Sequence, residues 1–85
     1  MAPVTVYSTQ YCGYCVRAKA LLDAKHVPYT EVRVDLDPDK MAEMMQKSGR
    51  RTVPQIFVGD HHVGGFDDLY ILDRSGGLDP LLADR

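Results

Sequence analysis

Residues 4–15 of the 85-residue chain read VTVYSTQYCGYC, and they predict a strand followed by the start of a helix. The two valines alternate with more polar neighbours, which is typical of a short strand. The residues from about Gly13 to Ala24 then place their apolar side chains on one face, which predicts a helix. Cys12 therefore falls where a strand ends and a helix begins, and Cys15 lies in the first turn of that helix.

The start of a helix has a chemical consequence for a cysteine. The first helical N–H groups have no partners within the helix, and the helix dipole is positive there, so both favour an anionic thiolate over a thiol. Cys12 therefore has the surroundings of a reactive thiolate. Cys15, one turn further in, is within reach of the Cys12 sulfur and less exposed. This arrangement suits thiol–disulfide exchange, in which a sulfur must both attack and leave.

Two other interpretations of the cysteine pair are open, a zinc site and an inert buried pair. A structural zinc site needs four ligands, so two more would have to come from His26, His61 and His62. His61 and His62 are neighbours on a predicted strand, so their side chains point to opposite faces and do not readily share one ion. We therefore expect a redox-active pair and no metal ligand.

Length and composition limit the function classes. Ten basic and twelve acidic residues give a formal charge of −2, which is no electrostatic footprint for binding nucleic acid. No apolar run approaches the ~20 residues that span a bilayer, and residues 1–6 lack the basic start of a signal peptide. We therefore expect a single domain over residues 1–85, acting as a monomer in the reducing cytoplasm and away from membranes.

The remaining segments alternate between strand and helix signals. Val32 and Val34 alternate with polar residues, which predicts a second strand. Asp37-Pro38 is a typical helix start, and the second helix is expected to end near Gly49. The later signals predict a strand at 55–58, a turn at 59–60, a strand at 61–63, a helix at 66–73 closed by glycines, and a packed tail at 78–82.

The predicted element order is β-α-β-α-β-β-α. A strand, a helix and a strand in succession form a right-handed crossover with parallel strands. The tight turn at 59–60 joins antiparallel strands instead. The expected fold class is therefore α/β, with a mixed four-stranded sheet flanked by three helices.

Three features near the predicted third strand each allow a structural and a functional interpretation. Pro54 is either a simple strand-entry proline or part of a cis Val53–Pro54 bond that turns the Val53 backbone toward an extended peptide. Gly64-Gly65 is either a turn or a place where a ligand backbone approaches closely. Asp67 and Asp68 either compensate the dipole of the third helix or bind a ligand ammonium.

Four motifs combine over nearly the whole chain: CGYC at 12–15, TVPQIF at 52–57, GGFDDL at 64–69 and GGLDPLL at 76–82. Together they resemble the small bacterial dithiol glutaredoxins. The resemblance implies a thioredoxin fold, a cis Val53–Pro54 bond and a groove for glutathione. It also implies a glutathione-dependent thiol–disulfide oxidoreductase whose partners are glutathione and disulfide-containing or glutathionylated proteins.

By position in these motifs, the resemblance implies Cys12 as the nucleophile and Cys15 as the resolving thiol. It implies that the Val53 backbone pairs with the cysteinyl residue of glutathione, that Arg51 faces the glycine carboxylate, and that the acidic pair at 67–68 holds the γ-glutamyl end. The full set of implied glutathione-binding residues is Tyr14, Arg51, Thr52, Val53, Pro54, Gly65, Phe66, Asp67 and Asp68.

Two departures from the family pattern affect this interpretation. Thr9 stands where the family often has a lysine, so Arg51 or Arg50 would carry more of the carboxylate contact, or glutathione would bind more weakly. Gly13 stands where proline is usual. A small residue there resembles iron–sulfur carriers, so the alternative is a dimer that holds a [2Fe–2S] cluster with Cys12 and glutathione as ligands. A third interpretation, an electron donor fed by thioredoxin reductase, is disfavoured by the glutathione-groove residues.

Overall fold

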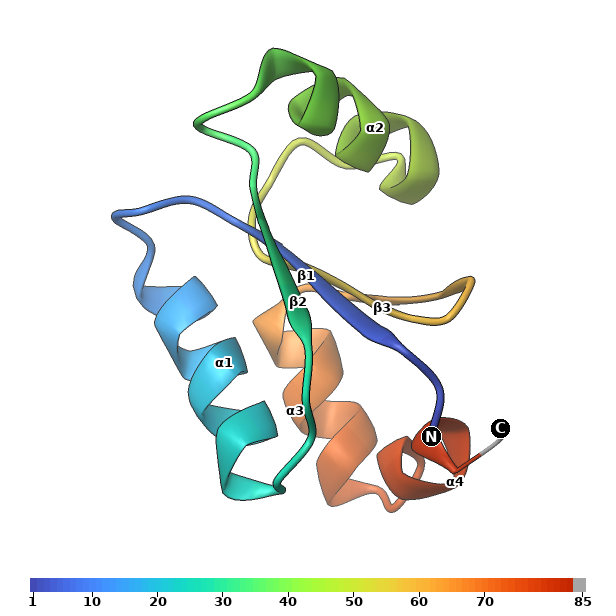
Figure 1. Ribbon diagram of the computed structural model, residues 1–85. Coiled ribbons are helices and arrows are strands. Elements are labelled where there is room, and N and C mark those ends of the chain that lie inside the picture. Colours follow the sequence, from blue (N-terminus) through green and yellow to red (C-terminus); the bar gives the residue numbers. More distant parts are fainter. Residues whose placement is uncertain (84–85) are drawn as a thin grey trace.

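The computed structural model describes residues 1–83, and its centre is a four-stranded sheet (Figure 1). The strands are β1 (Val4–Ser8), β2 (Thr30–Arg33), β3 (Gln55–Val58) and β4 (His61–Gly64). They lie in the order β2-β1-β3-β4, with β1 and β2 parallel and the other neighbours antiparallel. The predicted mixed sheet is confirmed.

Helices cover both faces of this sheet. They are α1 (Gly13–Ala24), α2 (Pro38–Ser48), α3 (Phe66–Arg74) and α4 (Leu78–Leu82). α1 and α3 lie side by side on one face, and α2 lies on the other (Figure 1). α4 lies beside the N-terminus. This layering is the thioredoxin fold that the family resemblance implies. None of the helices within residues 1–83 is long and apolar enough to cross a membrane.

The alternation of side chains along the strands divides the core into two clusters. Val6 and Ile56 point to the face covered by α1 and α3, where they join Leu22 and other fully buried side chains. Tyr7 and Phe57, one residue further along each strand, point to the other face and pack under α2. Because successive strand residues face opposite sides, β1 and β3 contribute to both clusters and fix the two helical layers against one sheet.

The ends of α2 lie at the predicted residues. The Asp37 carboxylate accepts a hydrogen bond from the Asp39 N–H over 2.9 Å, and Pro38 occupies the first turn. Gly49 ends the helix with a φ of 70°, a left-handed conformation that glycine adopts without a Cβ clash.

Two elements differ from the sequence prediction. The second strand pairs with β1 over Thr30–Arg33 and ends before Val34. The chain turns there, with the Leu36 N–H donating to the Arg33 carbonyl, although the Val34 N–H still donates to the Ser8 carbonyl of β1. The tail at 78–82 is a short fourth helix, where the pattern predicts only a packed segment and three helices in all. Leu78 and Leu82 bury one side of this helix against the larger core cluster, which stabilises a helix too short to form alone.

Candidate active site

Cys12 lies at the N-cap position of α1, as the sequence predicts. Its backbone is extended, and its Sγ accepts a hydrogen bond from the Cys15 N–H over 3.1 Å. The side chain is partly exposed. The sulfur is therefore open to a substrate and faces a backbone donor that stabilises negative charge on it.

Cys15 has the opposite environment. It is fully buried, three residues further along α1, and both cysteines are free thiols. Burial raises the pKa of the Cys15 thiol to about 12, and its hydrogen bond to the Cys12 sulfur acts in the same direction. Cys15 is therefore protonated at neutral pH, and Cys12 is the accessible sulfur of the pair.

The segment before β3 borders the Cys12 sulfur. The Val53–Pro54 peptide bond is cis, as the family resemblance implies. The Cys12 thiol donates to the Val53 carbonyl oxygen over 3.8 Å, a long contact of the kind that sulfur makes. Residues 52–54 therefore form the wall next to the reactive sulfur, although they lie about forty positions away in the chain.

A pocket of about 270 Å³ opens beside this wall. Val53 both lines the pocket and contacts the Cys12 sulfur, so the pocket adjoins the nucleophile. Its other walls come from the N-terminal turns of α1 and α3, where the Tyr14 and Phe66 rings stack with centroids 6.2 Å apart. The lining residues are Tyr14, Arg50, Thr52, Val53, Pro54, Gly65, Phe66, Asp67 and Asp68.

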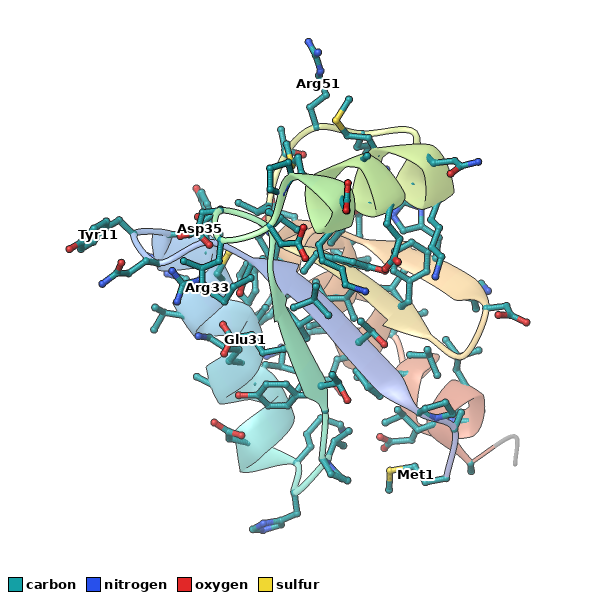
Figure 2. The ribbon with its side chains drawn as sticks, turned by 45° about the horizontal axis from the view of Figure 1, so that its top comes forward. Met1, Tyr11, Glu31, Arg33, Asp35 and Arg51 are labelled. Carbon is teal, nitrogen blue, oxygen red and sulfur yellow. The ribbon has the colours of Figure 1, made fainter. Side chains whose placement is uncertain are left out.

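The structure thus brings together all the binding residues named from the sequence except Arg51. Arg51 is exposed and projects from the top of the loop, away from the rest of the molecule, in Figure 2. Arg50, the residue before it, lines the pocket instead. Thr9, where the family often has a lysine, is not among the pocket residues.

The two acidic residues of the third helix have different surroundings. Asp68 accepts hydrogen bonds from the Gly65 N–H over 2.9 Å and from Arg50 over 3.0 Å, and these donors hold the pKa of its carboxyl below the ordinary range. Asp68 therefore caps α3. Asp67 is exposed, lines the pocket and has no recorded polar partner among residues 1–83, so its carboxylate is available to a cation.

Position 64, at the end of β4, requires glycine. Gly64 has a φ of 120°, and a Cβ there would overlap the Asp68 side chain. The adjacent Gly65 presents its N–H to the same carboxylate. The glycine pair therefore gives Asp68 the room to cap α3.

Sequence reasoning missed two residues behind the pocket, Gln55 and His62. Gln55 is fully buried and donates to Thr52, and His62 is hydrogen bonded to Gln55 over 2.7 Å. One signal was present, because a glutamine begins a strand whose other residues are all apolar. Within the described part of the chain no group of three or more His, Cys, Asp or Glu side chains is placed to hold a metal ion.

Comparison with known proteins places these observations in one family. The sequence matches the glutaredoxin family over residues 4–63. Glutaredoxin 3 of Escherichia coli K12 is 55% identical over 82 residues, which are 96% of this chain and 99% of that protein. A buckwheat glutaredoxin–glutathione complex superposes with a TM-score of 0.88 at 38% identity, covering 98% of this chain and 78% of that one. Glutaredoxin from Brucella melitensis superposes with a TM-score of 0.85 at 50% identity, covering 96% and 89%. The chain therefore belongs to the glutaredoxin family and is a glutathione-dependent thiol–disulfide oxidoreductase.

Proposed function

We propose that Cys12 is the nucleophile, that Cys15 is the resolving thiol, and that the pocket beside Cys12 holds the glutathione moiety of the substrate. One observation carries the proposal: Val53 is at once a wall of the pocket and a neighbour of the reactive sulfur. A tripeptide in the pocket can therefore present its own sulfur to Cys12 while its backbone pairs with that of Val53.

The first reaction is the removal of glutathione from a glutathionylated protein. The Cys12 thiolate attacks the glutathione sulfur, the bond between glutathione and the protein breaks, and the protein thiolate leaves and takes up a proton. The thiolate of a second glutathione attacks the bound glutathione sulfur, which releases glutathione disulfide and regenerates the Cys12 thiolate. The Cys15 N–H, 3.1 Å from the Cys12 sulfur, stabilises the thiolate when it leaves.

Protein disulfides need the second cysteine. Cys12 attacks one substrate sulfur, and Cys15 then attacks the Cys12 sulfur, so that the reduced protein leaves and a Cys12–Cys15 disulfide forms. Two glutathione molecules reduce that disulfide. Because the Cys15 thiol has a pKa of about 12, it must give up its proton during this step, and the departing substrate thiolate is a suitable acceptor.

The pocket lining includes a carboxylate and a guanidinium, the two kinds of charge that complement an ammonium and a carboxylate of glutathione. Asp67, with no recorded polar partner among the described residues, suits the γ-glutamyl ammonium. Arg50 is the guanidinium on the pocket wall and suits the glycine carboxylate. We therefore assign to Arg50 the contact that the family resemblance suggested for Arg51. A buckwheat relative has been solved as a glutaredoxin–glutathione complex, which supports a glutathione site in this fold.

A coupled assay with glutathione, glutathione reductase and a glutathionylated peptide tests these roles. Cys12→Ser is expected to be inactive. Cys15→Ser is expected to keep removing glutathione from the peptide and to stop reducing a protein disulfide through the dithiol route. Full turnover by Cys12→Ser, or loss of both reactions in Cys15→Ser with an intact fold, would contradict the assignment.

A second candidate function is a [2Fe–2S] carrier, and one observation favours it. Gly13 is exposed, and apart from its chain neighbours and its own helix backbone no atom of the described residues lies within 4 Å of the position its Cβ would take, so the start of α1 has room for a second copy beside Cys12. Anaerobic reconstitution with iron, sulfide and glutathione decides between a coloured dimer and a colourless monomer. For the redox function we propose a monomer in the cytoplasm, where glutathione keeps thiols reduced.

A further inference from the structure

Gln55 is a buried polar side chain directly behind the pocket. It is the first residue of β3, it follows the pocket residue Pro54, and its exposed fraction is 0%. Among the described residues only Ser8 is another buried polar side chain in the core. Because a buried amide without partners destabilises the fold, the contacts of Gln55 have to account for its position.

These contacts hold the pocket wall. The Gln55 side-chain amide donates to the Thr52 carbonyl over 3.0 Å and lies 3.2 Å from the Thr52 hydroxyl. Thr52 belongs to no helix or strand, and the Gln55 amide is the donor to its carbonyl that the structure records. The next residue, Val53, carries the carbonyl beside the Cys12 sulfur. Gln55 therefore restrains the chain one residue away from that contact.

His62 orients the Gln55 amide. Its Nε2 lies 2.7 Å from the Gln55 Oε1. A carbonyl can only accept hydrogen bonds, so the amide nitrogen of Gln55 must face Thr52 and its oxygen must face His62. His62 Nε2 therefore carries a proton and donates. The His62 imidazole in β4 also packs against the Phe57 ring in β3, with ring centroids 4.9 Å apart. This contact restrains the orientation of the imidazole.

From this chain of hydrogen bonds we propose that Gln55 and His62 are positioning residues that set the Thr52–Val53 wall against Cys12 and thereby determine how well the glutathione moiety binds. This inference rests on the proposed function of the pocket. Neither residue touches the Cys12 sulfur, whose donor is the Cys15 N–H on another element. We call the hydrogen bonds from His62 through Gln55 to Thr52 the relay. Loss of the relay should weaken binding in the pocket and leave the intrinsic reactivity of Cys12 unchanged.

Steady-state kinetics with a glutathionylated peptide test the proposal. Gln55→Met keeps the volume and removes the amide, and we expect its KM for the peptide to rise about fivefold, the loss expected for one hydrogen bond. His62→Leu should raise KM about threefold, and His62→Gln, which retains an N–H donor, should recover most of that loss. In each variant the rate of Cys12 alkylation by iodoacetamide should stay within about twofold of the wild type.

Two controls separate positioning from general loosening. His61→Leu changes the exposed neighbour on the same strand, outside the relay. Val63→Ala weakens the core below β4 without touching the relay. Both should keep KM within about twofold of the wild type. An unchanged KM in Gln55→Met and His62→Leu, or an equal rise in Val63→Ala, would overturn the inference.

The same measurements distinguish this inference from the proposed function. If wild-type protein shows no saturation with the glutathionylated peptide, or if Cys12→Ser is active, the assignment of the pocket fails. If wild type saturates and Cys12→Ser is inactive, the relay variants alone decide. His62 is only partly buried, so His62→Leu still gives a result if Gln55→Met does not fold.

Discussion

Arg50 and Arg51 are neighbours in the chain, but their side chains lie in different surroundings. Arg50 lines the pocket and pairs with Asp68 over 3.0 Å, whereas Arg51 is exposed and extends away from the molecule. We expect Arg50→Gln to raise the KM for a glutathionylated peptide about two- to fivefold. The contact that is lost is the ion pair between Arg50 and the glycine carboxylate of glutathione, and because the Arg50 side chain is half exposed, such a pair contributes up to about 1 kcal/mol. Arg51→Gln is the matched control and should leave KM unchanged. The reverse order would return the carboxylate contact to Arg51.

The His62 imidazole makes stability depend on pH. Burial lowers the pKa of His62, and the nearby Arg50 and His61 act in the same direction while Asp68 opposes them. A folded-state pKa below the unfolded value means that the unfolded chain binds the proton more readily. The free energy of unfolding should therefore fall as pH drops below about 6.5.

Urea denaturation at pH 7.5 and pH 5 measures this effect. His62→Gln removes the titrating group, so its loss of stability between the two pH values should be smaller than that of wild type. His61→Gln removes one of the neighbours that lower the His62 pKa, so its stability difference should lie between those of wild type and His62→Gln. Equal pH dependence in wild type and His62→Gln would show that other groups titrate in this range.

At the scale of whole elements, α2 depends on its first residue. The Asp37 carboxylate accepts the hydrogen bond of the Asp39 N–H, and no other side chain among residues 1–83 caps this end. Asp37→Ala should reduce the free energy of unfolding by about 1 kcal/mol. Asp39→Ala removes a first-turn charge and no cap, and should cost about 0.5 kcal/mol. Denaturant unfolding of both variants gives the comparison, and an equal loss would contradict the role of the cap.

Elements with local signals were predictable from the sequence, and elements set by distant contacts were not. α1, α2 and β3 have periodic side chains and caps or turns at their ends, and they begin and end close to the predicted residues. Val34 was assigned to a strand because it alternates with its neighbours, yet the chain turns there, with the Leu36 N–H bonded to the Arg33 carbonyl. The tail at 78–82 is too short for a helical period to appear, and its burial against the core decides its conformation.

The same distinction holds within the site. The cysteine spacing and the family motifs predicted eight of the nine residues that line the pocket, including Tyr14 and the pair at 67–68. They could not separate Arg50 from Arg51, because an irregular loop has no period that tells which neighbour faces inward. They also could not connect His62 to Gln55, since that hydrogen bond depends on the register of two strands.

At the scale of the whole molecule, α4 is hydrogen bonded to the segment next to the N-terminus. The Ala2 N–H donates to the Leu82 carbonyl over 2.8 Å, and the Leu82 side chain is buried in the main core cluster. Lys25, just after α1, pairs with Asp73 over 2.7 Å and Asp79 over 2.9 Å. This end of the molecule therefore connects α1, α3, α4 and the N-terminus (Figure 1).

Truncating the buried Leu82 side chain should reduce the free energy of unfolding and leave the reactivity of Cys12 unchanged. Leu82→Ala is expected to lower the free energy of unfolding by about 3 kcal/mol, the usual cost of a cavity at a buried leucine. Cys12 lies at the opposite end of α1, so its alkylation rate in the folded protein should stay at the wild-type value. Leu81→Ala, at a less buried neighbour, should cost less. A slower Cys12 alkylation in the folded Leu82→Ala variant would show that the two ends are coupled.

Because β1 lies in the interior of the sheet, the order in which the strands are synthesised affects when the sheet can form. β1 is the first strand in the chain, yet it pairs with β2 on one side and with β3 on the other, where Val4 faces Val58. At typical synthesis rates the partner strand emerges about 3–10 s later, after about 50 more residues. Until then β1 of the nascent chain can pair only with β2. The four-stranded sheet is therefore completed late, after β3 has left the exit tunnel.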